Sequence, residues 1–195
     1  MPETSHNITI ADTHVHYLSA GEESEKYIVL LHGASFTSAT WVETGTIDAL
    51  ARTGWHVIAF DLPGYGQSVP STIPRDRWVQ SALDALQIDK PMIVSPSMSG
   101  SFTLPFVTKH PNRVAGYIAV APVGLPNFFD QLSQVTFPVL AIWGEHDRVV
   151  PVSHGNIFVQ RVEHAKLIII PNAGHACYMN DPNVFNDRLV GFLEK

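Results

Sequence analysis

The stretch Met92-Ile-Val-Ser-Pro-Ser-Met-Ser-Gly100 predicts a buried strand that runs into a sharp turn and then into a helix. An apolar run gives way to small or turn-forming residues, and a second apolar segment, Phe102 to Val107, follows. A serine at such a turn is held in strained backbone geometry with its hydroxyl exposed at the edge of a sheet, and the residues two before and two after it must be small. Ser97 has Ser95 and Ser99 at those positions, so the pattern indicates Ser97 as a candidate nucleophile.

The flanking serines depart from the glycines that usually occupy these positions, since serine has a side chain where glycine has none. Serine is also a common N-cap residue at the start of a helix. This stretch by itself therefore leaves two interpretations open, a catalytic turn and an ordinary capped helix.

The composition predicts one domain over residues 1–195. With 45% hydrophobic content the chain can bury one sizeable core, and no shift in composition marks a boundary between two. The formal net charge of −6 is spread along the chain without basic clusters, which argues against a nucleic-acid partner.

Cysteine usage and hydropathy predict a protein of the reducing cytoplasm. Cys177 is the only cysteine, which excludes an internal disulfide, and we interpret it as a packing residue. Residues 1–10 are polar where a signal peptide needs an apolar stretch. The longest apolar runs, such as Leu167–Ile170, are far too short to span a bilayer, so we expect a soluble chain with no membrane partner.

Continuous apolar runs along the chain are typical of strands that helices bury on both faces. They are Tyr27–Leu31, His56–Phe60, the run at 92–94, Ala115–Val120, Val139–Trp143 and Lys166–Ile170. Helical spacing predicts helices around Trp41–Leu50, Pro74–Leu86, 153–162 and 182–193, besides the one after Ser97. This alternation specifies an α/β fold with a mostly parallel central sheet and helices on both faces. Functional groups gather at the carboxyl ends of the strands in such sheets.

Residues 7–19 alternate loosely around Ala11-Asp12, as two short strands joined by a turn would. They contain His14 and His16, and two histidines at this spacing on a strand share one face and can bind a metal ion. The metal-dependent amidohydrolases that use such a pair need a barrel of about 250 residues, and the chain lacks the repeated units for it. We therefore expect no metal and interpret both histidines as polar positions on the exposed face of an edge strand.

Ser97, Asp147 and His175, which follow three of the predicted strands, supply the residue types needed to activate a serine. Serine is a poor nucleophile until a base takes its proton, and a histidine base needs a carboxylate to hold its tautomer. Glu145 is an alternative acid, with Asp147 then a turn residue. The segment His32-Gly33-Ala34 ends another strand, where a tight turn can aim a backbone N–H at a developing oxyanion.

Five segments together resemble the successive signatures of the α/β-hydrolase superfamily. They are His32-Gly33, Asp61-Leu-Pro-Gly-Tyr-Gly-Gln-Ser68, Ser95-Pro-Ser-Met-Ser-Gly100, Trp143-Gly-Glu-His-Asp-Arg-Val-Val-Pro151 and Asn172-Ala-Gly-His175. The chain order serine, aspartate, histidine is also that of this superfamily. Ser95–Gly100, with His175-Ala-Cys-Tyr178, is similar to the small branch of α/β-hydrolase domain-containing protein 14, whose members include a transcription-factor-interacting factor B.

The resemblance implies an α/β-hydrolase fold and a role for each matching residue. Ser97 would be the nucleophile, His175 the general base and Asp147 the acid that orients it. The backbone N–H groups of Ala34 and Met98 match the oxyanion hole. No cofactor is implied.

Superfamily members commonly insert a lid after the strand that corresponds to 115–120, but here only Pro122–Pro138 separates that strand from the next. This leaves no room for a cap domain, so we expect a shallow and partly open acyl pocket. The side chains expected to line it are Phe36, Met98, Leu125, Phe128, Phe129 and Tyr178. The same side chains suit the core equally well, and the sequence leaves both interpretations open.

The residues and the resemblance together predict a serine hydrolase that cleaves small acyl esters, thioesters or amides through an acyl-enzyme on Ser97. One alternative is a deacylase or acyltransferase that passes the acyl group to an acceptor other than water. Another is an interaction module that has kept the fold and binds a protein partner with little or no catalysis. Fold alone does not distinguish these functions.

Overall fold

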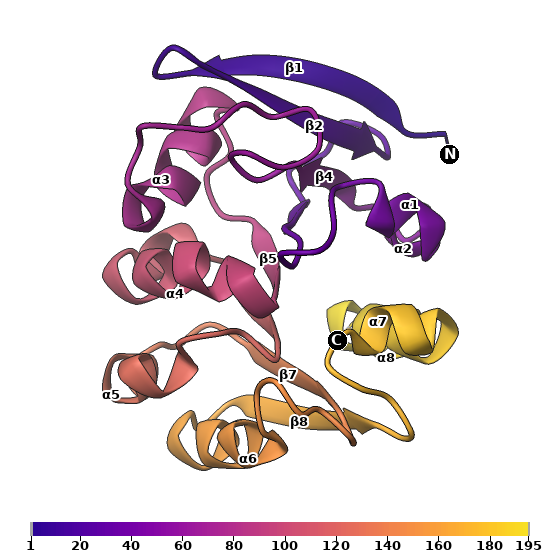
Figure 1. Ribbon diagram of the computed structural model, residues 1–195, viewed down its shortest axis with the longest axis vertical. Coiled ribbons are helices and arrows are strands. Elements are labelled where there is room, and N and C mark those ends of the chain that lie inside the picture. The colour runs from indigo at the N-terminus through magenta and orange to yellow at the C-terminus, as the bar shows by residue number, and fades with distance from the viewer. Residues whose placement is uncertain (1, 195) are drawn as a thin grey trace.

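Eight strands form one sheet that runs through the molecule (Figure 1). In the computed structural model, which describes residues 2–194, they are β1 (Thr4–Ile10), β2 (Thr13–Ala20), β3 (Tyr27–Leu30), β4 (His56–Phe60), β5 (Met92–Pro96), β6 (Gly116–Val120), β7 (Val139–Gly144) and β8 (Ala165–Ile170). Their order in the sheet is β1-β2-β4-β3-β5-β6-β7-β8. The pairs β1–β2 and β2–β4 are antiparallel and the other neighbours are parallel, so the predicted mostly parallel sheet is confirmed.

Helices cover both faces of this sheet, and each face buries its own apolar cluster (Figure 1). One face carries α3 (Arg75–Ala85), α4 (Gly100–Lys109), α5 (Phe129–Leu132) and α6 (Val152–Arg161), and the other carries α1 (Thr40–Glu43), α2 (Thr46–Arg52), α7 (Cys177–Asn180) and α8 (Pro182–Leu193). Short 3-10 turns are η1 (Ser97–Ser99), η2 (Pro111–Arg113) and η3 (Leu125–Phe128). Trp78, Phe102 and Phe158 anchor the first cluster, and Trp41, Leu50 and Phe185 anchor the second.

The central strands follow directly from their apolar sequences, because β5, β6 and β7 are buried at every position. The helix predicted around Trp41–Leu50 is instead divided into α1 and α2. Gly45 separates them with a φ of 69°, a left-handed conformation that glycine adopts without steric cost. The four-residue helix α7 was not predicted, since a segment that short shows no helical period.

The N-terminal hairpin forms as predicted, with β1 paired to β2 around Ala11 and Asp12, whose φ angles are 45° and 63°. His14 is exposed, but His16 is only 2% exposed. The interpretation of both histidines as exposed edge positions is therefore wrong for His16, and β2 is not an edge strand, because β1 and β4 flank it. The buried imidazole is stabilised by a 2.8 Å contact between its Nδ1 and a carboxylate oxygen of Asp61.

The connection between β6 and β7, residues 121–138, contains only the short elements η3 and α5. No cap domain stands over the sheet in residues 2–194, in agreement with the prediction. No helix within residues 2–194 is both long enough and apolar enough to cross a membrane.

Candidate active site

Ser97 occupies a strained turn between β5 and α4. Its φ of 50° lies in the left-handed region, which is uncommon for a residue with a side chain. Gly100 lets the start of α4 approach the chain after β6, because a Cβ there would lie 2.6 Å from the carbonyl oxygen of Val123. The Val123 N–H donates in turn to the Ser97 carbonyl oxygen at 2.8 Å. These contacts hold the turn in the geometry that exposes a serine hydroxyl above a parallel sheet.

The serines that replace glycine at positions 95 and 99 are fully buried and hydrogen-bonded. Ser95 Oγ lies 3.1 Å from Ser99 Oγ and 2.6 Å from Thr103 Oγ1. Thr103 Oγ1 lies 3.0 Å from the Tyr117 hydroxyl, and the Ser99 hydroxyl donates to the Pro96 carbonyl at 2.7 Å. Because a buried hydroxyl is costly only when it lacks a partner, this network explains how the turn tolerates serine in place of glycine.

His175 bridges Ser97 and Asp147 through two short hydrogen bonds. Its Nε2 lies 2.7 Å from Ser97 Oγ, and its Nδ1 lies 2.8 Å from Asp147 Oδ2. An ionised carboxylate can only accept, which places the imidazole proton on Nδ1 and leaves Nε2 to accept the Ser97 hydroxyl. The structure therefore brings together three predicted residues from the ends of β5, β7 and β8 in the geometry of an activated serine.

The Asp147 carboxylate is also held by the backbone. Its Oδ1 accepts the N–H groups of Val149 at 2.8 Å and Val150 at 2.9 Å, and the side chain has 0% exposure. Glu145, the alternative acid, is half exposed and accepts the Asn172 N–H at 2.9 Å. Of the two carboxylates, the one in contact with His175 is Asp147.

The loops that carry Asp147 and His175 pack against each other through their backbones. A Cβ on Gly144 would lie 2.0 Å from the carbonyl oxygen of Gly174, so only glycine permits this approach. The His146 N–H donates to the Ala173 carbonyl at 2.8 Å. This contact fixes the acid and the base relative to each other.

The turn at Gly33 lies beside Ser97, since a Cβ on Gly33 would lie 3.6 Å from Ser97 Cβ. His32 holds this turn: its Nδ1–H donates to the Gly33 carbonyl at 2.8 Å, and its Nε2 accepts the Leu62 N–H at 2.9 Å. Burial lowers the pKa of His32, which favours the neutral imidazole that both bonds require. The backbone that leads into Ala34 is thereby held next to the serine.

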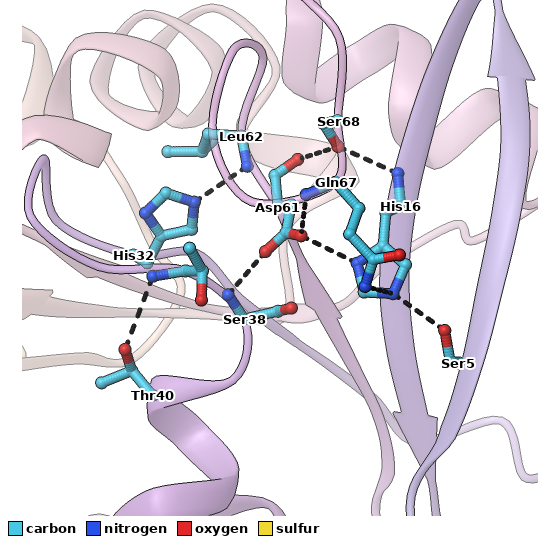
Figure 2. Close-up of polar contacts among 10 residues, drawn as sticks. Ser5, His16, His32, Ser38, Thr40, Asp61, Leu62, Gln67 and Ser68 are labelled. Atoms are coloured by element: carbon cyan, nitrogen blue, oxygen red, sulfur yellow. Dashed lines mark hydrogen bonds and ion pairs between the residues drawn. The ribbon is translucent and has the colours of Figure 1, made fainter.

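The Asp61 side chain connects the segment after Gly33 to strand β2 through Ser38 and His16 (Figure 2). Its Oδ1 accepts the Ser38 N–H at 2.7 Å, and its Oδ2 accepts the Gln67 N–H at 2.9 Å and contacts His16. Burial would raise the pKa of Asp61, but the hydrogen bonds from Gln67 and Ser38 outweigh it and hold the pKa below its ordinary value. The sequence marked Asp61 only as part of a family signature, and no signal linked it to His16.

Asp61→Asn should lower the free energy of unfolding by about 3 kcal/mol at neutral pH. One amide oxygen cannot replace both carboxylate oxygens, so either the Ser38 N–H or the two groups on Oδ2, the Gln67 N–H and His16, lose their acceptor. The pKa of Asp61 is lower in the folded protein than its value of about 3.9 in the unfolded chain. The ionised carboxylate therefore stabilises the fold above about pH 3.9, and this stabilisation is lost as pH falls through the folded-state pKa. The difference between wild type and variant, measured by urea unfolding, should therefore be constant near neutrality and shrink below about pH 4.

Asp76→Asn is the matched control, since that carboxylate forms an exposed ion pair with Lys109 at 3.0 Å. Exposed pairs contribute little, so this variant should unfold nearly as the wild type does. An equal loss of unfolding free energy in the two variants would contradict a large stabilising contribution from the buried hydrogen bonds of Asp61.

Part of the predicted acyl pocket lies in the core. Leu125 has 0% exposure and Phe129 has 8%, and both pack in the cluster beneath α4 and α5. We therefore correct the assignment of Leu125 as a pocket residue, because its side chain has no solvent-exposed surface, and Phe129 packs mainly in the same core. Phe36 and Phe128 are half-buried, and Tyr178 is 2% exposed with its ring 5.6 Å from that of Phe36.

Cys177 is fully buried at the start of α7. Burial raises the pKa of its thiol to about 12, so the sulfur stays protonated and unreactive at neutral pH. This agrees with its interpretation as a packing residue rather than a rival nucleophile.

A cavity of about 530 Å³ opens far from Ser97, at the amino ends of β5, β7 and β8. Its walls include Trp55, Met92 and Phe192, and none of its lining residues belongs to the serine, histidine and aspartate array. It is therefore separate from the candidate active site.

Residues 26–137 match the family model described as the alpha/beta hydrolase fold. The chain is 40% identical over 175 residues to "Protein ABHD14A" of Danio rerio, covering 86% of this chain and 64% of that protein. It is 31% identical to "Putative protein-lysine deacylase ABHD14B" of Homo sapiens, covering 86% of this chain and 82% of that protein. The crystal structure of a predicted CIB-like hydrolase from Thermoplasma acidophilum superposes with a TM-score of 0.95 at 27% identity, over 99% of this chain and 98% of that one.

Proposed function

The chain belongs to the α/β-hydrolase family, and from this premise we propose that it is a serine hydrolase that cleaves small acyl esters, thioesters or amides. The observation that carries the proposal is the pair of hydrogen bonds, 2.7 Å and 2.8 Å, that joins Ser97, His175 and Asp147. The name of one relative, "Putative protein-lysine deacylase ABHD14B" of Homo sapiens, supports acyl chemistry, and the cytoplasmic location stays a prediction.

In the proposed mechanism Ser97 Oγ attacks the acyl carbonyl carbon while His175 Nε2 takes the hydroxyl proton. Asp147 stabilises the imidazolium that forms. His175 then returns the proton to the departing alcohol, thiol or amine, which leaves an acyl-enzyme on Ser97. Water, activated by the same imidazole, attacks this ester and releases the acid, and the serine hydroxyl is restored.

The N–H groups of Ala34 and Met98 are proposed to bind the oxygen that becomes negative during each attack. The position of Gly33 beside Ser97, where a Cβ on Gly33 would lie 3.6 Å from Ser97 Cβ, supports this role for Ala34. The Tyr65 hydroxyl donates to the Met98 sulfur at 3.2 Å. This bond fixes the side chain of Met98 and helps to hold the turn after Ser97 in one conformation.

A second candidate function is deacylation of acyl-lysine, or transfer of the acyl group to an acceptor other than water. The 31% identity to "Putative protein-lysine deacylase ABHD14B" of Homo sapiens favours it. An amide bond to lysine would be opened by the same attack, with the lysine amine as leaving group. A binding module without catalysis is the remaining alternative, and it would leave the Ser97 hydroxyl unreactive.

A fluorophosphonate probe tests the proposal, because it phosphonylates only a serine that a neighbouring base activates. We expect one adduct, located at Ser97 by peptide mass spectrometry. Absence of labelling would contradict the hydrolase proposal and favour the binding module. Assays with p-nitrophenyl esters, acyl thioesters and acyl-lysine peptides, each with and without an added thiol acceptor, then distinguish hydrolysis from acyl transfer.

Short acyl chains should be preferred, because only η3 and α5 lie between β6 and β7 and no cap within residues 2–194 encloses a long chain. Burial of a methylene group contributes about 0.8 kcal/mol, so kcat/KM should rise over the first carbons of an acyl series and then level off or fall. We expect p-nitrophenyl acetate or butyrate to exceed the octanoate. A profile that climbs to palmitate, or activation by micelles, would contradict the open site.

A further inference from the structure

The Tyr178 side chain combines a buried ring with a hydroxyl that makes no hydrogen bond to any residue the structure describes. The residue is 2% exposed, and its ring packs against Trp41, Phe36 and Phe185 at centroid distances of 5.0 to 5.9 Å. No hydrogen bond joins its hydroxyl to another residue within 2–194, and the oxygen is not among the fully enclosed unpaired atoms, His56 Nδ1, Trp78 Nε1 and His154 Nδ1. The hydroxyl therefore keeps contact with solvent at an otherwise buried position.

This hydroxyl points to the turn beside Ser97. A Cβ on Gly33 would lie 3.3 Å from the Tyr178 oxygen and 3.6 Å from Ser97 Cβ. The two atoms thus lie on the same side of Gly33, around the space that a side chain there would occupy. Gly33 immediately precedes Ala34, whose N–H is proposed for the oxyanion hole. The helix α7 that carries Tyr178 begins two residues after His175.

We propose that Tyr178 is a further catalytic residue, whose hydroxyl donates a hydrogen bond to the substrate oxygen that becomes negative in the tetrahedral intermediate. This inference rests on the proposed hydrolase function and assigns a third donor beside the two backbone N–H groups. An acyl carbonyl attacked by Ser97 would present its oxygen to the Gly33-Ala34 turn. The hydroxyl next to this turn makes no hydrogen bond to another residue within 2–194 and is therefore available to this oxygen. Preorganised donors aimed at developing charge contribute strongly to the rate.

A purely structural role does not require the hydroxyl. Ring packing would be as good with phenylalanine, and the hydroxyl makes no hydrogen bond to another residue within 2–194 that a structural role would use. Burial also raises the pKa of Tyr178 well above its ordinary value, so the hydroxyl remains protonated and able to donate throughout the pH range in which a serine hydrolase is assayed.

Tyr178→Phe tests the assignment because it removes one oxygen and keeps the ring. We expect kcat for a short p-nitrophenyl ester to fall by about 100-fold with little change in KM, and the melting temperature to be unchanged or higher. Tyr27→Phe is the matched control, since Tyr27 is half-buried at the start of β3 and its hydroxyl also lacks a hydrogen bond in the described chain. That variant should keep kcat.

A trifluoromethyl ketone bearing the same short acyl chain provides the second readout. Ser97 Oγ adds to its carbonyl carbon and His175 takes the proton, so the bound species carries a negative oxygen in the tetrahedral geometry. Its inhibition constant should rise in Tyr178→Phe by the same factor by which kcat falls. Unchanged kcat and inhibition in an active protein would overturn the assignment alone, and a raised KM with normal kcat would mean that Tyr178 only binds the acyl group. A wild type without turnover or probe labelling would instead remove the proposed function, and this assignment with it.

Discussion

Ser97→Ala should abolish acyl turnover, with a loss that approaches about a million-fold if serine, histidine and aspartate act as a unit. The physical reason is that the residue removed forms the covalent bond. His175 Nε2, 2.7 Å from the Ser97 oxygen, would then have no hydroxyl to deprotonate. The measurement is kcat for p-nitrophenyl acetate, together with loss of fluorophosphonate labelling. Circular dichroism should show that the fold survives, since Ser97 Oγ has no other hydrogen bond among residues 2–194.

Ser95→Ala is the matched control two residues away. It should keep most of the turnover, because Ser95 Oγ faces Thr103 and Ser99 in the interior rather than His175. It should lower the free energy of unfolding by about 1 to 3 kcal/mol, since it leaves buried hydroxyls with fewer partners. If Ser95→Ala were inactive and Ser97→Ala active, the assignment of the nucleophile would be wrong.

Asp147→Asn should lower kcat by about 10,000-fold without unfolding the protein. The side-chain oxygen of asparagine can still accept from Val149 and Val150, as Oδ1 does at 2.8 Å and 2.9 Å. Its NH2 group would then face His175 Nδ1 and donate to it, which moves the imidazole proton to Nε2. In that tautomer Nε2 cannot accept the proton of Ser97, and the charge that stabilises the imidazolium is also lost.

Glu145→Gln is the control for this prediction, and it should keep normal turnover. Its carboxylate accepts the Asn172 N–H and lies half exposed, so the amide oxygen can take over that bond. The measurement is kcat of the Asp147→Asn and Glu145→Gln variants under identical conditions. An active Asp147→Asn enzyme beside an inactive Glu145→Gln enzyme would transfer the acid role to Glu145.

The sequence by itself determined the sheet and the order of the reactive residues. Continuous apolar runs such as Val139–Trp143 indicate strands that are buried on both faces. Segments with helical periodicity between these runs indicate the helices that cover the sheet. Because parallel strands end at one edge of a sheet, the positions of Ser97, Asp147 and His175 after three strands already predicted that they lie together. The short connection after β6 was enough to predict that no cap domain is inserted between β6 and β7.

Only the tertiary structure decided which polar groups are paired and which apolar side chains are enclosed. His16 and Asp61 are 45 positions apart, and Thr103 links Ser95 on β5 to Tyr117 on β6. A sequence pattern shows which positions are polar and which are apolar. A hydrogen bond between distant segments depends on how those segments pack, and local periodicity carries no information about that packing. For the same reason Leu125 and Phe129 could be read as pocket or as core, and the free hydroxyl of Tyr178 became visible only when its neighbours were known. Burial of a side chain, and the partner that compensates it, are properties of the packed chain.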